Sequence, residues 1–108
     1  MNSFYRGKTV AVTGGLGLIG SFLCEHLAEA GAKTILIDDE SKGSWRYIEH
    51  LRPRVDYRKK DLANPKQAVE ALTDSEYVFH LASRAYGVGF SQKNNFQKQI
   101  RQLRRQPR

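Results

Sequence analysis

Apolar runs and polar or glycine-rich stretches follow one another along most of the chain in an order that predicts strands and helices in turn. Short apolar runs that end at glycine or aspartate predict strands, whereas apolar residues at helical spacing, such as Ile19, Leu23 and Leu27, predict helices. The expected strands cover residues 8–13, 34–37, 55–58 and 76–82, and the expected helices cover residues 18–30, 45–51 and 64–72. The last of these helices has a clear start signal, because Asn64 precedes Pro65 and Gln67 stands three residues after Asn64.

This order of elements predicts an α/β fold. Strand, helix, strand, short helix, strand, helix, strand is the pattern of a parallel sheet with crossover helices. The first, second and fourth expected strands carry apolar runs rather than an alternating pattern, which is typical of strands that are covered on both faces. We therefore expect a parallel sheet of about four strands with flanking helices.

Composition limits the class of protein. The 108 residues allow one domain of modest core, 40% are hydrophobic and 27% are charged, as in a globular protein. One cysteine excludes an internal disulfide, and no Cys/His pair has zinc-finger spacing. The longest run without charge, residues 9–24, is too short and too polar to span a bilayer, and no signal-peptide cleavage site follows it. We expect a cytoplasmic protein without a membrane segment.

The net charge of +7 comes entirely from the end of the chain. Residues 1–76 hold 11 basic and 11 acidic side chains, whereas residues 77–108 hold seven basic side chains and no acidic one. Such a polar run is usually solvated or disordered. No aromatic residue stands among the final arginines to stack on bases, which argues against nucleic-acid binding by this segment.

A glycine-rich loop joins the first expected strand to the first expected helix. It reads Thr-Gly-Gly-Leu-Gly-Leu-Ile-Gly and holds G-x-G-x-x-G at Gly15, Gly17 and Gly20, and G-x-x-G-x-x-G from Gly14 onward. Asp38 follows 18 residues after Gly20, at the end of the second expected strand. Strand, glycine loop, helix and distant acid together are what a dinucleotide-binding loop requires, although a glycine turn that binds nothing stays open.

The glycines and the start of the helix have separate expected tasks. Gly14 permits the tight turn out of the strand, Gly17 lets the backbone approach a pyrophosphate, and Gly20 lets the helix pack closely on the sheet. Backbone N–H groups around Leu18 and Ile19 are expected to bind the phosphates with help from the helix dipole.

Asp38 bears on which dinucleotide is bound. Its carboxylate can accept hydrogen bonds from both hydroxyls of the adenosine ribose, and its charge repels a 2′-phosphate. We therefore expect NAD in preference to NADP, with Lys42 and Arg46 close enough in sequence to soften that preference.

Together with the glycine loop, three short segments make the chain resemble the extended short-chain dehydrogenase/reductase family, the NAD-dependent sugar epimerases and dehydratases. Asp38-Asp39 closes the second expected strand, Asp61-Leu62 follows the third, and His80-Leu81-Ala82-Ser83 ends the fourth. The resemblance covers about residues 7–92 and implies a Rossmann-like fold, incomplete here, with NAD as cofactor.

The resemblance also implies roles at the strand ends. Asp61 would bond the adenine amino group with the Leu62 backbone beside it, and Arg84 would lie near the ribose and phosphates. The full set of expected cofactor-binding residues is Gly14, Gly17, Leu18, Ile19, Gly20, Asp38, Asp39, Asp61, Leu62, Leu81, Ala82, Ser83 and Arg84.

Plainer explanations stay open for several residues. Asp61 beside two lysines can be a surface charge, and His80 at a strand end is better explained by packing than by acid–base chemistry. Cys24 and His26 are expected to be structural, with no metal site. Residues 86–89 fit either a loop that closes over substrate or a plain glycine turn.

The catalytic pair of the family is missing. Its base is a tyrosine with a lysine four residues later, which lowers the tyrosine pKa. The residues four positions after the five tyrosines are Thr9, Leu51, Asp61, Leu81 and Phe90. None is a lysine, so we assign no catalytic residue and leave open whether this chain is an enzyme.

We therefore expect an NAD-binding amino-terminal portion of a nucleotide-sugar epimerase- or dehydratase-like oxidoreductase, truncated and not catalytic alone. Residues 1–92 would form the Rossmann-like half domain, and residues 93–108 a basic polar tail, helical or disordered. A nucleotide sugar would bind only in a full-length relative. The alternative is a non-catalytic dinucleotide-binding module whose tail contacts an acidic partner or nucleic acid. The fourth strand would form an open sheet edge, a site for self-association.

Overall fold

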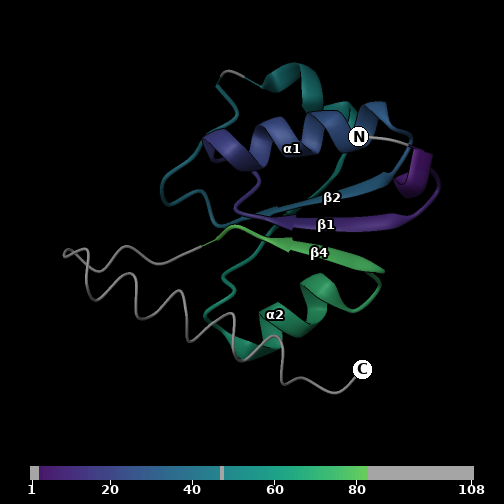
Figure 1. Ribbon diagram of the computed structural model, residues 1–108. Coiled ribbons are helices and arrows are strands. Elements are labelled where there is room, and N and C mark those ends of the chain that lie inside the picture. The colour runs from purple at the N-terminus through teal and green to yellow at the C-terminus, as the bar shows by residue number, and fades with distance from the viewer. Residues whose placement is uncertain (1–2, 47, 83–108) are drawn as a thin grey trace, which may run out of the picture.

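Four parallel strands pair in the order β3-β2-β1-β4 in the computed structural model, which describes residues 3–46 and 48–82 (Figure 1). The strands are β1 (Thr9–Thr13), β2 (Lys33–Asp38), β3 (Asp56–Lys59) and β4 (Tyr77–His80). The helices are α1 (Leu18–Glu29) and α2 (Pro65–Leu72), with 3-10 helices η1 (Ser3–Tyr5) and η2 (Glu49–Arg54). The expected α/β class and the Rossmann-like parallel sheet are confirmed.

The strands divide their side chains between two cores. Val10 and Val12 of β1 pack with Cys24 and Leu27 of α1, on one face of the sheet. Ala11 lies between the two valines and faces the other way, where it packs with residues of β2 and α2. Since successive residues of a strand point to opposite faces, one apolar strand serves both layers. Figure 1 shows α1 and α2 on opposite sides of the sheet.

The short helix lies later than the sequence pattern predicts. We expected it at residues 45–51, ending before Pro53, whereas η2 runs Glu49–Arg54 and contains that proline. A short 3-10 helix makes few internal hydrogen bonds, so the N–H that proline lacks costs little there. Leu51 is fully buried in the α1-side core, which fixes this segment by packing.

Helix α2 starts as its sequence indicates. The Asn64 side chain accepts hydrogen bonds from the N–H groups of Lys66 and Gln67, with Pro65 at the first helical position. The Gln67 side chain does not complete a capping box with Asn64. It accepts from the N–H of Asp61 instead, at 2.8 Å, and so ties the end of the β3–α2 connection to the helix.

Strand β4 is an edge of the sheet within the described residues. It pairs with β1, and Tyr77 and Val78 remain 39% and 41% exposed. The strand ends at His80 rather than at residue 82, because the N–H groups of Leu81 and Ala82 turn toward Thr13. The prediction that the fourth strand forms a sheet edge agrees with this arrangement.

Candidate functional site

The carboxyl ends of the parallel strands lie at one end of the sheet, and the predicted site residues among those described follow these strand ends (Figure 1). Gly15 N–H donates to the carbonyl of Ile37 at 3.2 Å, which joins the glycine loop to the end of β2. Lys60 N–H donates to the carbonyl of Asp38 at 3.1 Å, which brings the end of β3 beside β2. In open parallel sheets, ligands bind beyond the carboxyl ends of the strands, at the point where the strand order reverses. Here the reversal lies at β1, between β2 and β4.

Gly14 and Gly20 are required by the way the loop folds. Gly14 has φ +70°, and a Cβ there would lie 2.9 Å from the backbone nitrogen of Ala82. A Cβ on Gly20 would lie 2.1 Å from the carbonyl oxygen of Gly14. Any side chain at either position would collide with backbone, so both glycines are explained by the turn and by the close approach of α1.

Gly17 differs from these two glycines. Its φ of −73° is open to any residue, and among the described residues a Cβ there would make one tight contact, with the carbonyl oxygen of Gly14 at 3.3 Å. Gly17 is also the N-cap of α1 and offers no capping side chain, so the N–H groups of the first helical turn have no side-chain acceptor from it. The following residues, Leu18 and Ile19, are 89% and 70% exposed.

The Asp38 carboxylate fastens the glycine loop to β2. Its Oδ2 accepts from Leu16 N–H at 3.0 Å, and its Oδ1 accepts from Glu40 N–H at 2.8 Å. These bonds orient the Asp38 carboxylate, and each of its oxygens can still accept a further hydrogen bond. Sequence analysis missed Leu16, whose backbone makes this bond while its side chain is buried in the core beside Trp45.

Asp39 and Asp61 shape turns at the same edge. The Asp39 carboxylate accepts from the backbone N–H of Ser41 at 2.9 Å, and the Asp61 carboxylate accepts from the N–H of Ala63 at 3.0 Å. Both aspartates are exposed. Leu62, half-buried, packs against the core on the α2 side.

Thr13 and His80 meet at the junction of β1 and β4. They are register partners, and the Thr13 hydroxyl lies 2.8 Å from Nδ1 of His80. The same hydroxyl oxygen accepts from the N–H groups of Leu81 and Ala82, at 2.9 and 3.1 Å. Thr13 is completely buried. A buried hydroxyl at the end of an apolar strand must find partners, and that is the sequence signal from which its importance follows.

The remaining reactive groups belong to the scaffold. Burial raises the pKa of the Cys24 thiol to about 12, consistent with a core residue. Burial is the larger cause, and a hydrogen bond to Glu40 the next, of a raised pKa for Tyr57. Across residues 3–46 and 48–82, no three His, Cys, Asp or Glu side chains cluster as metal ligands. No helix in that part of the chain has the length and apolar character needed to cross a membrane.

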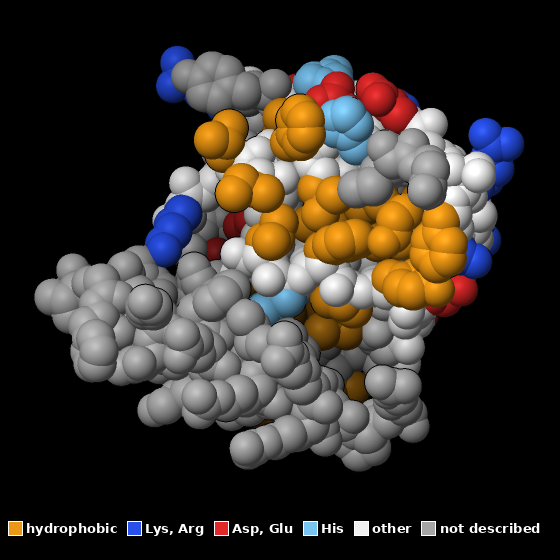
Figure 2. Space-filling model, viewed as in Figure 1, with side chains coloured by type: hydrophobic (Ala, Val, Ile, Leu, Met, Phe, Trp, Pro, Cys, Tyr) orange, Lys and Arg blue, Asp and Glu red, His pale blue; other side chains and the backbone are white. Residues whose placement is uncertain are grey.

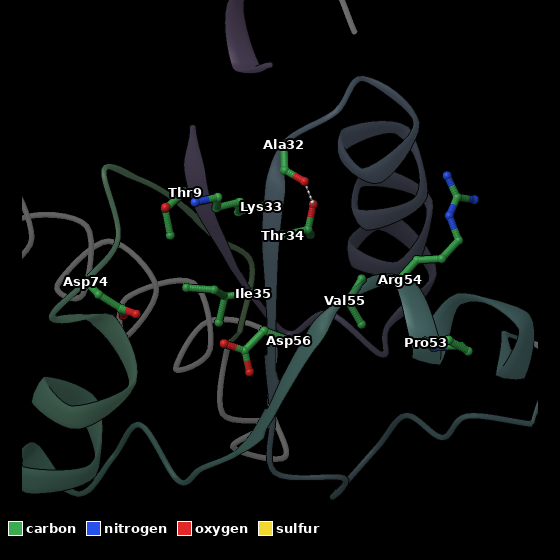
Figure 3. Close-up of a pocket in the computed structure, with 10 residues that line it drawn as sticks. All are labelled: Thr9, Ala32, Lys33, Thr34, Ile35, Pro53, Arg54, Val55, Asp56 and Asp74. Atoms are coloured by element: carbon green, nitrogen blue, oxygen red, sulfur yellow. Dashed lines mark hydrogen bonds between the residues drawn. The ribbon is translucent and has the colours of Figure 1, made fainter. Parts of the chain in front are cut away.

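An open hollow of about 500 Å³ lies at the other end of the sheet (Figure 3). Thr9, Lys33 and Asp56, the first residues of three strands, contribute to its wall. Its two carboxylates, Asp56 and Asp74, are both bonded to Arg58. None of the predicted cofactor-binding residues up to Ala82 lines it.

Several predicted features fall outside the described residues. They are Ser83 and Arg84, the glycine-containing segment 86–89 and the basic tail 93–108. The predicted role of the tail, and the boundary of the half domain at residue 92, therefore stay predictions.

Comparison with known proteins gives matches over most of the chain. The family model described as NAD dependent epimerase/dehydratase family matches residues 10–101. The chain is 32% identical over 76 residues to UDP-N-acetyl-alpha-D-glucosaminuronate decarboxylase of Bacillus cytotoxicus, which covers 70% of this chain and 24% of that protein.

Solved structures agree with this match. An epimerase from Methanothermobacter thermautotrophicus has a TM-score of 0.70 and 32% identity, covering 91% of this chain and 29% of that one. The Bordetella bronchiseptica enzyme WbmF in complex with NAD+ and UDP has a TM-score of 0.65 and 26% identity, covering 78% and 25%. The chain thus spans about a quarter of the length of these proteins.

Proposed function

The chain belongs to the NAD dependent epimerase/dehydratase family, and from that membership we propose that it is the dinucleotide-binding amino-terminal part of an epimerase- or dehydratase-like oxidoreductase. The chemistry of the longer relatives needs groups beyond this part. No tyrosine here is followed by lysine at the fourth position, so the chain is proposed to bind cofactor without catalysing a reaction alone.

The observation that carries the proposal is the glycine at position 17, the N-cap of α1. Its φ does not call for glycine, and a Cβ there would make one tight contact, 3.3 Å from the carbonyl oxygen of Gly14, whereas a Cβ on Gly14 or Gly20 would collide with backbone. It stands at an uncapped helix start, where N–H groups and the helix dipole favour an anion. A pyrophosphate that approaches the backbone here would explain why the position lacks a side chain.

The rest of the edge fits the adenosine half of the ligand. Asp38 is oriented by Leu16 and Glu40 and keeps acceptor capacity for ribose hydroxyls. Asp61 and Leu62 would hold the adenine, and Leu81 and Ala82 would line the cofactor together with Ser83 and Arg84. The NAD+ complex of the Bordetella bronchiseptica enzyme supports NAD as the ligand, with NADP disfavoured by Asp38.

The substrate part of the proposal is coarser. UDP in that same complex supports a nucleotide sugar as the substrate of a longer relative. The cytoplasm is the proposed location of the chain.

Titration with NADH, followed by its fluorescence, tests the proposal. Wild-type chain is expected to bind saturably, and Gly17→Val is expected to bind roughly ten-fold more weakly or worse, because branched carbons would occupy the place of the pyrophosphate. Gly7→Ala serves as control. Gly7 has φ +75° and lies at the other end of β1, so this variant loses stability without touching the site.

Thermal melts of both variants show that each is folded in the titration. Retained affinity in Gly7→Ala together with lost affinity in Gly17→Val supports the proposal. Equal affinity of Gly17→Val and wild type, or no saturable binding by wild type, contradicts it.

A further inference from the structure

Three groups lie within hydrogen-bond distance of the Thr13 hydroxyl. Leu81 N–H and Ala82 N–H both donate to its oxygen, at 2.9 and 3.1 Å, and His80 Nδ1 lies 2.8 Å away. A threonine hydroxyl has two acceptor lone pairs and one proton to donate. The two backbone donors use the lone pairs, so the proton is left for His80.

This accounting assigns the tautomer of the imidazole. Nδ1 accepts a hydrogen bond from the Thr13 hydroxyl, so the proton of the neutral ring is on Nε2. If Nδ1 carried the proton instead, three donors would point at one hydroxyl oxygen in a completely buried position. His80 thus orients Thr13, and Thr13 in turn holds the two backbone N–H groups that follow β4.

The residues held in this way form a wall of the proposed dinucleotide site. The backbone of Leu81 and Ala82 passes Gly14 so closely that a Cβ on Gly14 would lie 2.9 Å from the Ala82 nitrogen. The Leu81 N–H donates to both the hydroxyl and the carbonyl of Thr13, the latter at 3.1 Å, whereas the Ala82 N–H donates to the hydroxyl. Loss of the hydroxyl would therefore release Ala82 before Leu81.

We propose that His80 is a positioning residue that acts through the Thr13 hydroxyl to hold the Leu81–Ala82 backbone against the glycine loop, which preforms that wall of the dinucleotide site. The inference rests on the proposed function for its consequence in binding. The hydrogen-bond chain itself is independent of any ligand. Neither residue needs to touch the dinucleotide, and neither is assigned a catalytic role.

Two measurements on the ligand-free chain test the hydrogen-bond chain. Nitrogen chemical shifts of the His80 ring, in weakly alkaline buffer, are expected to report a protonated Nε2 and an accepting Nδ1. In Thr13→Val, which removes the hydrogen bonds of the hydroxyl and keeps the side-chain shape, amide hydrogen exchange at Ala82 is expected to speed up by roughly 3- to 10-fold more than at Val78. Thr13→Ser keeps the hydroxyl and is expected to retain wild-type exchange.

Binding of NADH tests the positioning role. Thr13→Val and His80→Phe are expected to lose roughly 3- to 10-fold in affinity for NADH. Thr13→Ser is expected to stay within about two-fold of wild type. His80→Asn, whose side-chain oxygen can accept a hydrogen bond from Thr13, is expected to bind NADH more tightly than His80→Phe. Rescue by the two conservative variants separates positioning from a general loss of packing.

The outcomes are distinguishable from failure of the proposed function. A protonated Nδ1 in wild type, or unchanged Ala82 exchange in Thr13→Val, overturns the hydrogen-bond chain whether or not NADH binds. If the ring shifts and the amide exchange come out as expected but Thr13→Val and His80→Phe bind NADH as tightly as wild type, the positioning role alone is overturned. No NADH binding by wild type overturns the proposed function and the positioning role with it, while the ligand-free measurements still decide the hydrogen-bond chain.

Discussion

At the scale of single residues, two side chains of the site, Asp38 and Thr13, each bond two backbone N–H groups. Asp38 accepts from Leu16 and Glu40, and Thr13 accepts from Leu81 and Ala82. Backbone N–H groups cannot move without the chain, so such bonds set loop positions before a ligand arrives. The edge described here is therefore preorganised by residues from both halves of the sheet.

Asp38→Ala is expected to narrow the preference for NAD over NADP. A carboxylate that faces a 2′-phosphate adds charge repulsion to a lost hydrogen bond, together worth on the order of 1–3 kcal/mol, or roughly 5- to 150-fold. The variant also frees Leu16 N–H, so both affinities should fall, and the ratio of the two dissociation constants is the quantity to measure.

Asp39→Ala is the matched control for that measurement. It removes the same charge one residue later, where the carboxylate bonds Ser41 in an exposed turn. An equal change of the ratio in both variants, or a wild type that binds NADP as tightly as NAD, would show that Asp38 does not select the dinucleotide.

Sequence reasoning reached only part of this residue-level picture. Glycine spacing and an acid at a strand end are local signals, and they predicted Gly14, Gly20 and Asp38 as neighbours in one loop system. The meeting of Thr13 with His80 is set by the register of β1 on β4, between residues 67 positions apart. Nothing local in a sequence fixes such a register.

At the scale of elements, Arg58 joins β3 to the end of α2. Its guanidinium donates to the carbonyl of Ala71 at 3.0 Å and to both oxygens of Asp74, at 2.8 and 3.0 Å, with Asp56 as a further partner. Arg58 lowers the pKa of Asp74. The helix thus depends on one side chain as well as on its small apolar face.

Asp74→Asn is expected to lower stability slightly at neutral pH. Because the folded-state pKa of Asp74 lies below its unfolded value, the stabilisation is present above the unfolded pKa and is lost as pH falls through the folded pKa. Wild type and variant should therefore converge in strong acid. Asp74 is exposed, so the effect is small. Urea denaturation over a pH series measures it.

Glu49→Gln provides the comparison for Asp74→Asn. Its pair with Arg52 is long, at 3.9 Å, and exposed on both sides, so no change in stability is expected at any pH. A difference between wild type and Asp74→Asn that persists undiminished at low pH would contradict the linkage argument.

Element types were predictable because apolar runs, caps and breakers are local signals. The first and last residues of the elements were less predictable, because tertiary contacts determine them. Leu51, fully buried, draws the short helix past Pro53, and Thr13 ends β4 at His80 by taking the next two N–H groups.

At the scale of the whole molecule, much apolar surface is left uncovered by the described residues. Leu18, Ile19 and Phe22 of α1 are 89%, 70% and 65% exposed. Phe4 packs edge to face against Tyr77 of β4 and is 51% exposed. Figure 2 shows apolar side chains gathered on this face, over α1 and the neighbouring sheet. Patches of this kind mark interaction sites or aggregation risk.

The isolated chain is expected to melt below about 65 °C, the top of the usual range for mesophilic domains, and to self-associate through β4. Added NAD at about a hundred times its dissociation constant should raise stability by roughly 2.7 kcal/mol. Thermal melts at several protein concentrations, with light scattering, measure both effects.

A charged edge provides the control for association. Val78→Lys lies on β4, and Val69→Lys lies on α2 with its side chain 67% exposed. Only the first should suppress association, since a lysine on an open strand blocks edge pairing. Cooperative, monomeric unfolding of the wild type above about 65 °C without cofactor would refute the expectation.

The order of strands in the sheet also has a consequence for how the chain folds. β1 pairs with β2 across about 24 residues of chain, but with β4 across 67. Closing the longer loop costs roughly 1 kcal/mol more entropy, and β4 cannot pair until most of the described chain has been synthesised. The three-stranded part of the sheet can thus assemble while β4 is still being made, so the wall of the site that follows β4 is the last part of it to form.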